Sequence, residues 1–239
     1  MNYLNTLVIA TRNKGKIEEI ADLLDGFPIT IKGLEAFGPI PIVEENGRTF
    51  DENAYIKASF TSRILGYPAL ADDSGLVVEA LNGAPGVYSA RYAGEHASDP
   101  ERCRKLLREM DHAADRKAAF ECVISIAVPT GAALTYEGRC EGEIAGEPAG
   151  ENGFGYDPVF YYPPLKKTFA QLTRTEKNRV SHRGKALRAL RDEFDKVLIW
   201  IRQQMPVAEK FICESSDLNH ANNISAISPA VKALRKKEN

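Results

Sequence analysis

The sequence predicts an α/β protein in which capped helices alternate with apolar strands. Apolar residues recur at helical spacing behind polar caps, whereas residues 117–129 and 132–145 are long runs of strand-forming side chains. Mixed elements of this kind pack as an α/β fold. With 239 residues, the chain is long enough to bury a substantial core as one large domain or two small ones.

The first quarter of the chain predicts one strand and two helices. Leu7–Ala10 forms the strand, and the helix that follows it ends at Gly26. The capping box Thr49–Glu52 begins a second helix, which ends at Gly66. The first helix is indicated by apolar residues at helical spacing, namely Ile17, Ile20, Ala21 and Leu24.

The middle of the chain predicts a hairpin, a loop and a helix. Strand Tyr67–Ala71 is expected to pair with Gly75–Leu81 across the polar segment between them. The turn-rich stretch Asn82–Ser89 follows. Asp99-Pro100 combines a helix cap with a first-turn proline, and the helix that it begins runs to about Met110.

The last part of the chain predicts a second hairpin and a long helix. Lys117–Pro129 and Ala132–Ala145 flank a Pro-Thr-Gly turn and are expected to pair. A second capping box, Thr173–Glu176, precedes a helix over about His182 to Met205. Residues 1–206 form the predicted domain. Residues 207–239 form an extension that is flexible or loosely docked, with a dimer clasp or a weak anionic contact as the alternative.

Composition and charge exclude several classes of protein. A net charge of −2 gives no long-range attraction to nucleic acid or to an anionic membrane, so any phosphate recognition is local. The four cysteines lie far apart without a Cys-x-x-Cys pair, which argues against zinc and redox motifs and fits a reducing compartment. The sequence shows no signal peptide and no apolar run of about 20 residues. We therefore expect a cytoplasmic protein with neither a nucleic-acid partner nor a membrane partner.

An acidic pair in the middle of the chain predicts a metal site. Asp72 and Asp73 follow the apolar run Ala69–Ala71 and precede Ser74-Gly75. Two adjacent carboxylates repel each other and are costly at the end of a buried strand. A divalent cation relieves both problems, and a metal beside carboxylates indicates hydrolysis or phosphoryl chemistry. The alternative is a solvated Asp-Asp-Ser-Gly turn.

The polar loop between the first strand and the first helix has the features of an anion site. A helix N-terminus presents free N–H groups and the positive end of its dipole. Thr11 and Asn13 can cap the helix, and Gly15 allows close approach of the backbone. The loop predicts a triphosphate cradle without the Walker A pattern, and a capped helix with surface lysines is the alternative. Its positive charge comes from Arg12, Lys14 and Lys16.

Glu44 and Glu45 form a second acidic pair, in the loop before the second helix. On its own such a pair is typical of a solvated turn. Opposite Asp72 and Asp73, it could complete an octahedral site together with water and substrate oxygens. Such a site suits Mg²⁺ better than zinc, because no Cys or His is offered.

Two later segments predict ligand contacts. In the run Gly153–Pro158, the glycines let a flat ligand approach the backbone and stack on Phe154 or Tyr156, and a β-bulge with packed aromatics is the alternative. Further on, three donors lie within a few helical turns and can read base carbonyls or neutralise phosphate. They are Lys177, His182 and Arg183.

Seven motifs stand in a fixed order: Thr11–Lys16, Glu44–Gly47, Phe50–Ala54, Ala71–Gly75, Gly83–Gly94, Gly153–Pro158 and Ser181–Arg183. Together they resemble the inosine/xanthosine triphosphate pyrophosphatase family, whose members act as dITP/XTP pyrophosphatases. Each motif is short, but seven in register are specific. The resemblance covers about Leu7 to Met205, most of the chain.

This resemblance implies a fold and a reaction. The fold is an elongated α/β structure with a central mixed sheet and an active-site cleft between two lobes, in a homodimer. The reaction is Mg²⁺-dependent hydrolysis of ITP, dITP or XTP to the monophosphate and pyrophosphate, by attack of water at the α-phosphorus. The motifs leave open the choice between ITP and XTP, the choice between ribose and deoxyribose, the rejection of GTP and the dimer interface.

The resemblance also implies roles for single residues. Asp73 is expected to act as general base and, with Glu44, to bind Mg²⁺, whereas a part for Glu45 or Asp72 in metal binding stays open. Ser74 contacts the substrate, and the loop Thr11–Lys16 holds the phosphates. The remaining assignments concern the purine: Phe154 and Tyr156 sandwich it beside Gly155, Asp157 orients the site, and Lys177, His182 and Arg183 bind base and phosphate.

Two other functions share some of these features. A phosphatase of the haloacid-dehalogenase type uses an aspartate nucleophile at a strand end, but its Asp-x-Asp spacing is missing here. A purine nucleotide sensor on the same fold would bind ITP with Mg²⁺ and not turn it over. The complete set of carboxylates argues against the sensor.

Overall fold

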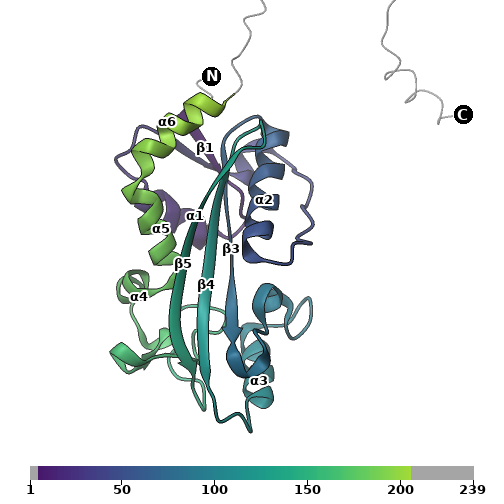
Figure 1. Ribbon diagram of the computed structural model, residues 1–239, viewed down its shortest axis with the longest axis vertical. Coiled ribbons are helices and arrows are strands. Elements are labelled where there is room, and N and C mark those ends of the chain that lie inside the picture. The colour runs from purple at the N-terminus through teal and green to yellow at the C-terminus, as the bar shows by residue number, and fades with distance from the viewer. Residues whose placement is uncertain (1–4, 206–239) are drawn as a thin grey trace, which may run out of the picture. The chain divides into compact units, whose positions relative to one another are not determined.

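The computed structural model describes residues 5–205, which form one mixed sheet with helices on both faces (Figure 1). Within these residues the sheet has seven strands in the spatial order β2-β1-β3-β4-β5-β6-β7. The mixed α/β sheet predicted from the sequence is thereby confirmed. The strands are β1 (Thr6–Ile9), β2 (Thr30–Gly33), β3 (Ala69–Val78), β4 (Lys117–Ala127), β5 (Ala133–Ile144), β6 (Phe160–Tyr162) and β7 (Lys167–Thr168).

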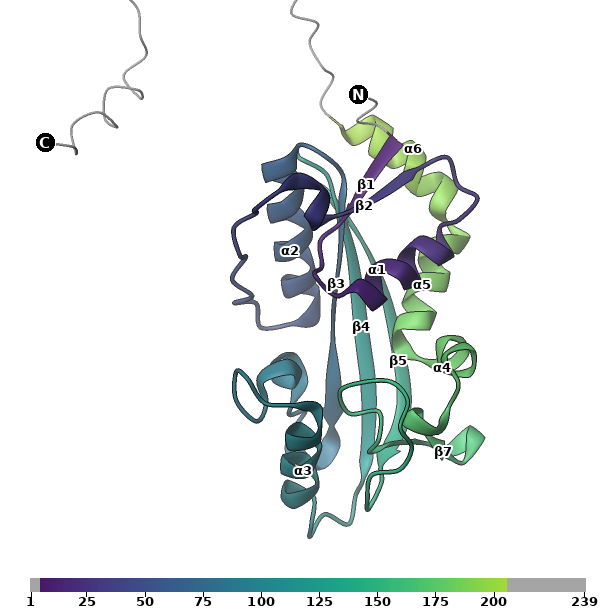
Figure 2. The same cartoon turned by 180° about the vertical axis from the view of Figure 1, so that it is seen from behind.

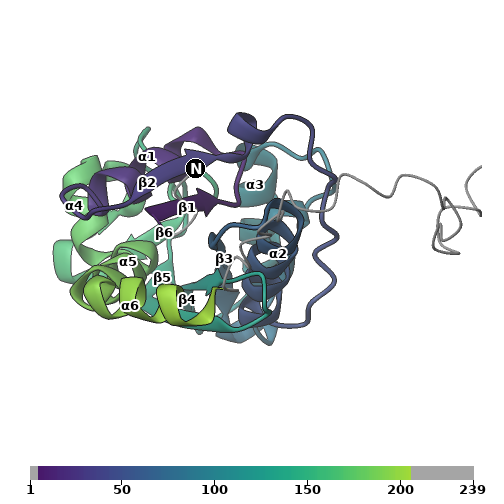
Figure 3. The same ribbon diagram turned by 90° about the horizontal axis from the view of Figure 1, so that it is seen from above.

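Helices cover the two faces of the sheet. In Figures 1 and 3, α2 lies on one side of β3 and β4, and α5 and α6 lie on the other side. The α-helices of the described residues are α1 (Lys14–Leu23), α2 (Phe50–Leu65), α3 (Asp99–Glu109), α4 (Arg174–Val180), α5 (His182–Asp192) and α6 (Phe194–Gln204). Short 3-10 helices connect them: η2 (Leu34–Phe37), η3 (Glu79–Leu81), η4 (Gly86–Arg91), η5 (Pro163–Leu165) and η6 (Phe169–Gln171).

The strands pair with one another over different lengths. β3 pairs antiparallel with β4 along its whole length, from Ala69 opposite Ala127 to Val78 opposite Ala118. β1 is parallel to β3 and reaches only Leu70. Figure 2 shows β1 and β2 beside one half of β3, while β4 and β5 continue beyond them. The other half of β3 is therefore an edge of the sheet.

Two hydrophobic clusters lie along one face of the sheet. The first joins Leu70 of β3 to Ile124 of β4 and to helices α5 and α6. The second joins Leu76 of β3 to Phe120 of β4 and Phe160 of β6. β3 thus passes from one cluster into the other, and its residues 71–75 lie between them. This arrangement accounts for the two lobes that the family resemblance implies.

Short-range signals in the sequence predicted most helix ends. Thr49 Oγ1 accepts the N–H of Glu52 at 3.1 Å at the start of α2, and Gly66 ends this helix with a φ of 72°. Glu176 N–H donates to Thr173 Oγ1 at 3.2 Å, and the Glu176 carboxylate accepts the N–H of Thr173 at 2.8 Å. The predicted helices at α1 and α3 and the β4–β5 hairpin are likewise confirmed, although α1 ends at Leu23 and not at Gly26. The predicted cap at Asp99 is wrong, because Ser98 caps α3 in a capping box with Glu101 and Asp99 is the first helical residue.

The predicted hairpin of Tyr67–Ala71 with Gly75–Leu81 is wrong. The two segments belong to one continuous strand, β3, because pairing with β4 holds every residue from 69 to 78 extended. Gly75 serves close packing here and does not form a turn. A Cβ at this position would lie 2.5 Å from Gly86 O and 2.5 Å from Ser89 Oγ.

The predicted long helix over His182 to Met205 is also wrong, because it divides at Glu193 into α5 and α6. The Glu193 N–H bonds to the carbonyl of Leu190, three residues back, at 3.3 Å, which tightens the turn. The sequence gives no sign of this break, because apolar spacing continues across it from Leu190 to Phe194 and Val197. The extension predicted over 207–239 lies outside the described residues.

Strands β2, β6 and β7 were not predicted. β6 and β7 have only three and two residues, and β2, Thr-Ile-Lys-Gly, has one large apolar side chain where β1 has three. A periodicity cannot be read over so few positions. Among residues 5–205, no helix has the length and apolar character that crossing a bilayer requires.

Gly138 of β5 allows α5 to sit directly on the sheet. A Cβ there would overlap the carbonyl oxygen of His182 and lie 2.7 Å from the nitrogen of Ala186, both backbone atoms. We expect Gly138→Ala to lower the free energy of unfolding by about 1–3 kcal/mol, as overpacking does, in urea denaturation. Gly146→Ala is the matched control, because a Cβ at that position would meet no atom within 4 Å. Equal effects of the two substitutions would contradict this account.

Candidate active site

Asp72 and Asp73 lie in the middle of β3, opposite Ile124 and Val123 of β4. Successive side chains of a strand point to opposite faces, so the two carboxylates project to opposite sides of the sheet. The expectation that they crowd together at a strand end is therefore wrong. The two carboxylates pair with different cations, Asp72 with Lys16 and Arg183 and Asp73 with Lys57.

Asp72 is buried between two cations, Lys16 on α1 and Arg183 on α5. Lys16 Nζ lies 2.9 and 2.8 Å from the two carboxylate oxygens, and Arg183 Nη2 lies 3.1 Å from Oδ2. Burial raises the pKa of Asp72, but Lys16 and Arg183 outweigh it and hold the pKa well below its usual value. Arg183 Nη2 also donates to Ser74 Oγ at 3.1 Å. Glu19 Oε2 lies 4.0 Å from Arg183 Nη1, so on this face of β3 two cations are set against two carboxylates.

Asp73 faces α2 and contacts Lys57. Lys57 Nζ lies 2.9 Å from Asp73 Oδ1 and 3.0 Å from Glu45 Oε2. Burial raises the pKa of Asp73, and Lys57 offsets this only in part. Burial lowers the pKa of Lys57, but the carboxylates around it, Asp73 first, outweigh burial and raise the pKa. Asp73 thus has the raised pKa that suits a general base, beside a lysine that stays charged.

Between Leu70 and Val77, one edge of β3 has no strand paired with it among the described residues, and we call this stretch the open edge. β1 ends at Ile9, opposite Leu70, and the next pairing on that edge within the described residues is the bridge of Val77 with Pro85. A ligand lying across this edge can reach Asp72 on one face and Asp73 on the other.

Residues 11–16 lead from the end of β1 to the start of α1 beside the open edge (Figure 2). Asn13 caps α1, because its Oδ1 accepts the N–H of Lys16 at 3.3 Å, and the Asn13 N–H donates to Thr11 Oγ1 at 3.2 Å. Arg12 is exposed and donates to Ile40 O at 3.4 Å, beside a separate cavity of about 670 Å³. The Lys14 side chain lies outside the described part of the chain.

A cavity of about 190 Å³ lies on the Asp72 side of the sheet. The His182 ring in its wall stacks on Phe120, with ring centroids 4.7 Å apart and planes 12° apart. Burial, and next Arg183, lower the pKa of His182 well below its usual value, so the ring is neutral. Nine predicted site residues line this cavity: Lys16, Ser74, Phe154, Gly155, Tyr156, Asp157, Lys177, His182 and Arg183.

A neighbouring cavity of about 330 Å³ shares Lys16, Phe154 and Lys177 with the first and adds Asn13 and Gly15. Asn13, Gly15 and Lys16 therefore border one cleft with the segment around Phe154. Each wall of this cleft comes from a different part of the sequence.

Phe154 and Tyr156 are placed differently in this cleft. Phe154 is 48% exposed, with Lys177 Nζ 4.6 Å from its ring centroid. Tyr156 is only 3% exposed, and its hydroxyl donates to Ser89 O at 2.9 Å. Asp157 accepts the N–H of Phe154 at 2.9 Å and forms an ion pair with Lys177. Phe154 offers a ring face, whereas Tyr156 forms a fixed wall, and the purine sandwich stays a prediction.

Residues 7–193 match the Ham1 family. The chain belongs to this family. It is 57% identical over 199 residues to a protein of Desulfotalea psychrophila named dITP/XTP pyrophosphatase, a match that covers 83% of this chain and 89% of that protein. It is 60% identical over 195 residues to a protein of Syntrophobacter fumaroxidans with the same name, which covers 82% of this chain and 84% of that protein.

Solved structures of Ham1 proteins have the same fold. A Ham1 protein from Coxiella burnetii superposes with a TM-score of 0.77 at 46% identity, over 80% of this chain and 98% of that one. The Ham1 protein of Staphylococcus aureus gives a TM-score of 0.75 at 44% identity, over 80% and 99% of the two chains. The family resemblance inferred from the seven motifs is thereby confirmed.

The donor atoms near Asp73 fit Mg²⁺ when substrate is present. Among residues 5–205, no three His, Cys, Asp or Glu side chains group closely enough to hold a metal ion alone. Mg²⁺ in proteins commonly takes one or two carboxylates and completes its shell with water and substrate phosphates. Asp73 and Glu45, bridged by Lys57, provide two such carboxylates, and Glu44 is exposed in the same loop.

Sequence reasoning missed Lys57 in this Ham1-family chain. A signal was present, because Lys57 lies between Ala54 and Ala58 on the helix face that packs on the sheet. Asn53, one turn before it, accepts the N–H of Gly47 at 2.8 Å and ties the Glu44–Gly47 loop to α2. A lysine on an inward-facing stripe indicates a buried counter-charge.

Asp72→Asn and Asp73→Asn are expected to differ in stability. Asp72→Asn removes the carboxylate that Lys16 and Arg183 share and leaves Arg183 only Glu19, at 4.0 Å. We expect a loss of about 3 kcal/mol in the free energy of unfolding at neutral pH. Asp73→Asn is expected to change it by less than about 1 kcal/mol, because burial already disfavours the charged form. Urea denaturation of both variants measures the difference. Similar losses would contradict the assignment of separate faces.

The stabilisation that Asp72 contributes to the folded protein is expected to fall as the pH is lowered. Its folded-state pKa lies below the value of about 3.9 for an unfolded aspartate, so its contribution is complete above that value. The contribution is lost as pH falls through the window between the two values. The stability gap between wild type and Asp72→Asn is therefore expected to narrow on acidification. A gap that widens would show that another group dominates.

Proposed function

We propose that this protein hydrolyses the deaminated purine nucleoside triphosphates ITP, dITP and XTP to the monophosphate and pyrophosphate. The proposal rests on one cleft. Its aromatic cavity is the one lined by Phe154, Tyr156 and the neutral His182. This cavity adjoins the basic loop of residues 11–16, here called the phosphate loop, beside the open edge of β3. Asp73 lies on that strand with its lysine partner. Relatives named dITP/XTP pyrophosphatase support the same substrate class.

In this proposal the purine occupies the aromatic cavity. Phe154 stacks on the base, and Tyr156 forms the opposing wall. Arg183 and Lys177 supply donors for the 6-keto oxygen of a deaminated purine. The exocyclic amine of adenine would leave such donors unpaired, at a cost of about 1–3 kcal/mol each.

The triphosphate binds along residues 11–16. The N-terminus of α1 offers free N–H groups, and Lys16 and Arg183 beside it supply cationic donors for the anion. Ser74 contacts the substrate from β3, where its hydroxyl already accepts a hydrogen bond from Arg183. The open strand edge leaves room for the phosphates to pass from the Asp72 face to the Asp73 face.

Asp73 acts as the general base on the attacking water. The hydrogen bond that Lys57 Nζ donates to Asp73 Oδ1 at 2.9 Å fixes the direction of the carboxylate. Lys57, which stays charged, helps to neutralise the charge that develops on the phosphates.

Asp73 and Glu44 are the proposed Mg²⁺ ligands, and Glu45 joins them because it shares Lys57 with Asp73. When bound, Mg²⁺ lowers the pKa of water and draws charge from the leaving pyrophosphate. We also propose that the protein is a cytoplasmic homodimer with a domain over residues 1–206. Its free cysteines 103, 122 and 140 fit a reducing compartment.

The decisive measurement is Mg²⁺-dependent turnover of ITP, dITP, XTP, GTP and ATP, with phosphate and pyrophosphate detected separately. We expect pyrophosphate from ITP, dITP and XTP and little product from ATP and GTP. Orthophosphate as the product would indicate an aspartate-nucleophile phosphatase. Tight binding of ITP without product would indicate a sensor. Either outcome overturns the proposal.

Asp73→Asn tests the general base. We expect kcat to fall at least about a hundredfold, the scale of losing such a group, while circular dichroism shows an intact fold. Asp51→Asn is the matched control, because Asp51 is an exposed carboxylate on the first turn of α2. Turnover of Asp73→Asn at the wild-type rate would remove Asp73 from the mechanism.

A further inference from the structure

One helix bonds to both backbone polar groups of Gly155, its N–H and its carbonyl oxygen. The Gly155 N–H donates to Asp99 Oδ2 at 2.5 Å, and the Gly155 carbonyl oxygen accepts the Cys103 thiol at 3.3 Å. Asp99 and Cys103 are four residues apart on α3, so their side chains lie on the same side of the helix. We call these two contacts the α3 grip.

The α3 grip acts on the segment that forms the aromatic cavity. Gly155 separates Phe154 from Tyr156 and has a φ of 65°, in the left-handed region that favours glycine. On the other side of Phe154, Asp157 accepts its N–H at 2.9 Å. The Phe154 backbone is therefore fixed from two directions, by Asp157 and by α3.

α3 is tied to a second wall of the same cavity through Arg102. Arg102 forms an ion pair with Asp99 and donates to the carbonyl oxygens of Ala90, at 3.1 Å, and of Ala97. Ala90 follows Ser89, whose carbonyl oxygen accepts the Tyr156 hydroxyl at 2.9 Å. Ser89, Ala90, Asp99 and Arg102 all line the cavity.

Cys103 is suited to donate in this arrangement. Its side chain is 3% exposed, and burial, with Asp99 as the second cause, raises the pKa of its thiol to about 11. At neutral pH it therefore keeps the proton that the Gly155 carbonyl oxygen accepts. Asp99 is a charged acceptor for the Gly155 N–H, and such bonds are stronger than neutral ones.

We propose that Asp99 and Cys103 are positioning residues for purine recognition, because their grip on Gly155 sets Phe154 and Tyr156 against the base. The inference rests on the proposed function and adds a specific role for α3. Neither residue lies at Asp73 or at the phosphate loop, so the grip governs the affinity for the base and not the chemical step.

Asp99→Ala tests the charged half of the grip. We expect KM for ITP to rise about tenfold, as for a lost charge-assisted hydrogen bond, with kcat within about twofold of wild type. Inorganic triphosphate has no base, so its inhibition constant is expected to stay unchanged. Asp99→Asn keeps an oxygen acceptor for Gly155 and should restore most of the affinity.

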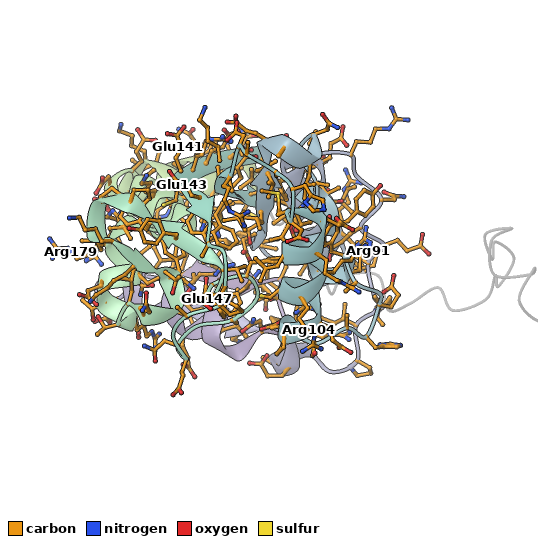
Figure 4. The ribbon with its side chains drawn as sticks, turned by 90° about the horizontal axis from the view of Figure 1, so that it is seen from below. Arg91, Arg104, Glu141, Glu143, Glu147 and Arg179 are labelled. Atoms are coloured by element: carbon orange, nitrogen blue, oxygen red, sulfur yellow. The ribbon has the colours of Figure 1, made fainter. Side chains whose placement is uncertain are left out.

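Two substitutions of Cys103 test the thiol hydrogen bond of the α3 grip without a change of charge. Cys103→Val keeps a similar volume and removes the donor, and we expect KM for ITP to rise about threefold, as for a neutral hydrogen bond. Cys103→Ser keeps a donor and should stay closer to wild type. Arg104→Ala is the matched control on the same helix, because Arg104 projects into solvent from α3 (Figure 4).

Two outcomes overturn the inference. One is an unchanged KM for ITP in Asp99→Ala or, if that variant does not fold, in Cys103→Val. The other is an equal rise in the KM for ITP and in the inhibition constant of triphosphate, which would indicate a general distortion. Failure of the proposed function itself is distinguishable, because wild type would then release no pyrophosphate from ITP.

Discussion

Asp72 lies buried in the middle of β3 and accepts hydrogen bonds from Lys16 on α1 and from Arg183 on α5. A buried carboxylate costs several kcal/mol unless charge partners and hydrogen bonds compensate it, so these three elements must meet at one point. The meeting point lies between the two hydrophobic clusters, where Leu70 and Leu76 of the same strand belong to different cores. Glu19 is a second counter-charge for Arg183, at 4.0 Å. Lys16 and Arg183 also line the cavity beside this point.

The side chains of β3 point alternately to the two faces of the sheet, so the two faces carry different groups. Alternation along the strand sends Asp72 and Ser74 towards the aromatic cavity and Asp73 towards α2 and Lys57. The two neighbouring carboxylates therefore have different environments. Lys16 and Arg183 lower the pKa of Asp72, whereas burial raises the pKa of its neighbour.

Close backbone packing holds the cavity walls in place. α5 approaches β5 at Gly138, where no side chain separates the helix from the strand, and this contact sets His182 and Arg183 beside Phe120. The Phe154 segment turns through two glycines with positive φ, at positions 153 and 155, before Tyr156 enters the core. Backbone packing and hydrogen bonds thus preorganise a cavity whose walls come from β3, β4, α3, α5 and the loop after β5.

The α/β class, the β4–β5 hairpin, the caps at Thr49 and Thr173, and the family, through motifs that keep their order, could all be predicted from the amino-acid sequence. These features depend on hydrogen bonds and spacings within a few residues, which a sequence displays directly. Only the tertiary structure decided that Asp72-Asp73-Ser74-Gly75 is continuous strand, since pairing with β4, about 50 residues away, overrides its turn chemistry. It alone also decided that adjacent aspartates face opposite ways, that Lys57 joins Asp73 to Glu45, and that His182 is neutral. Each of these depends on burial and on charges from distant segments, which no local pattern contains.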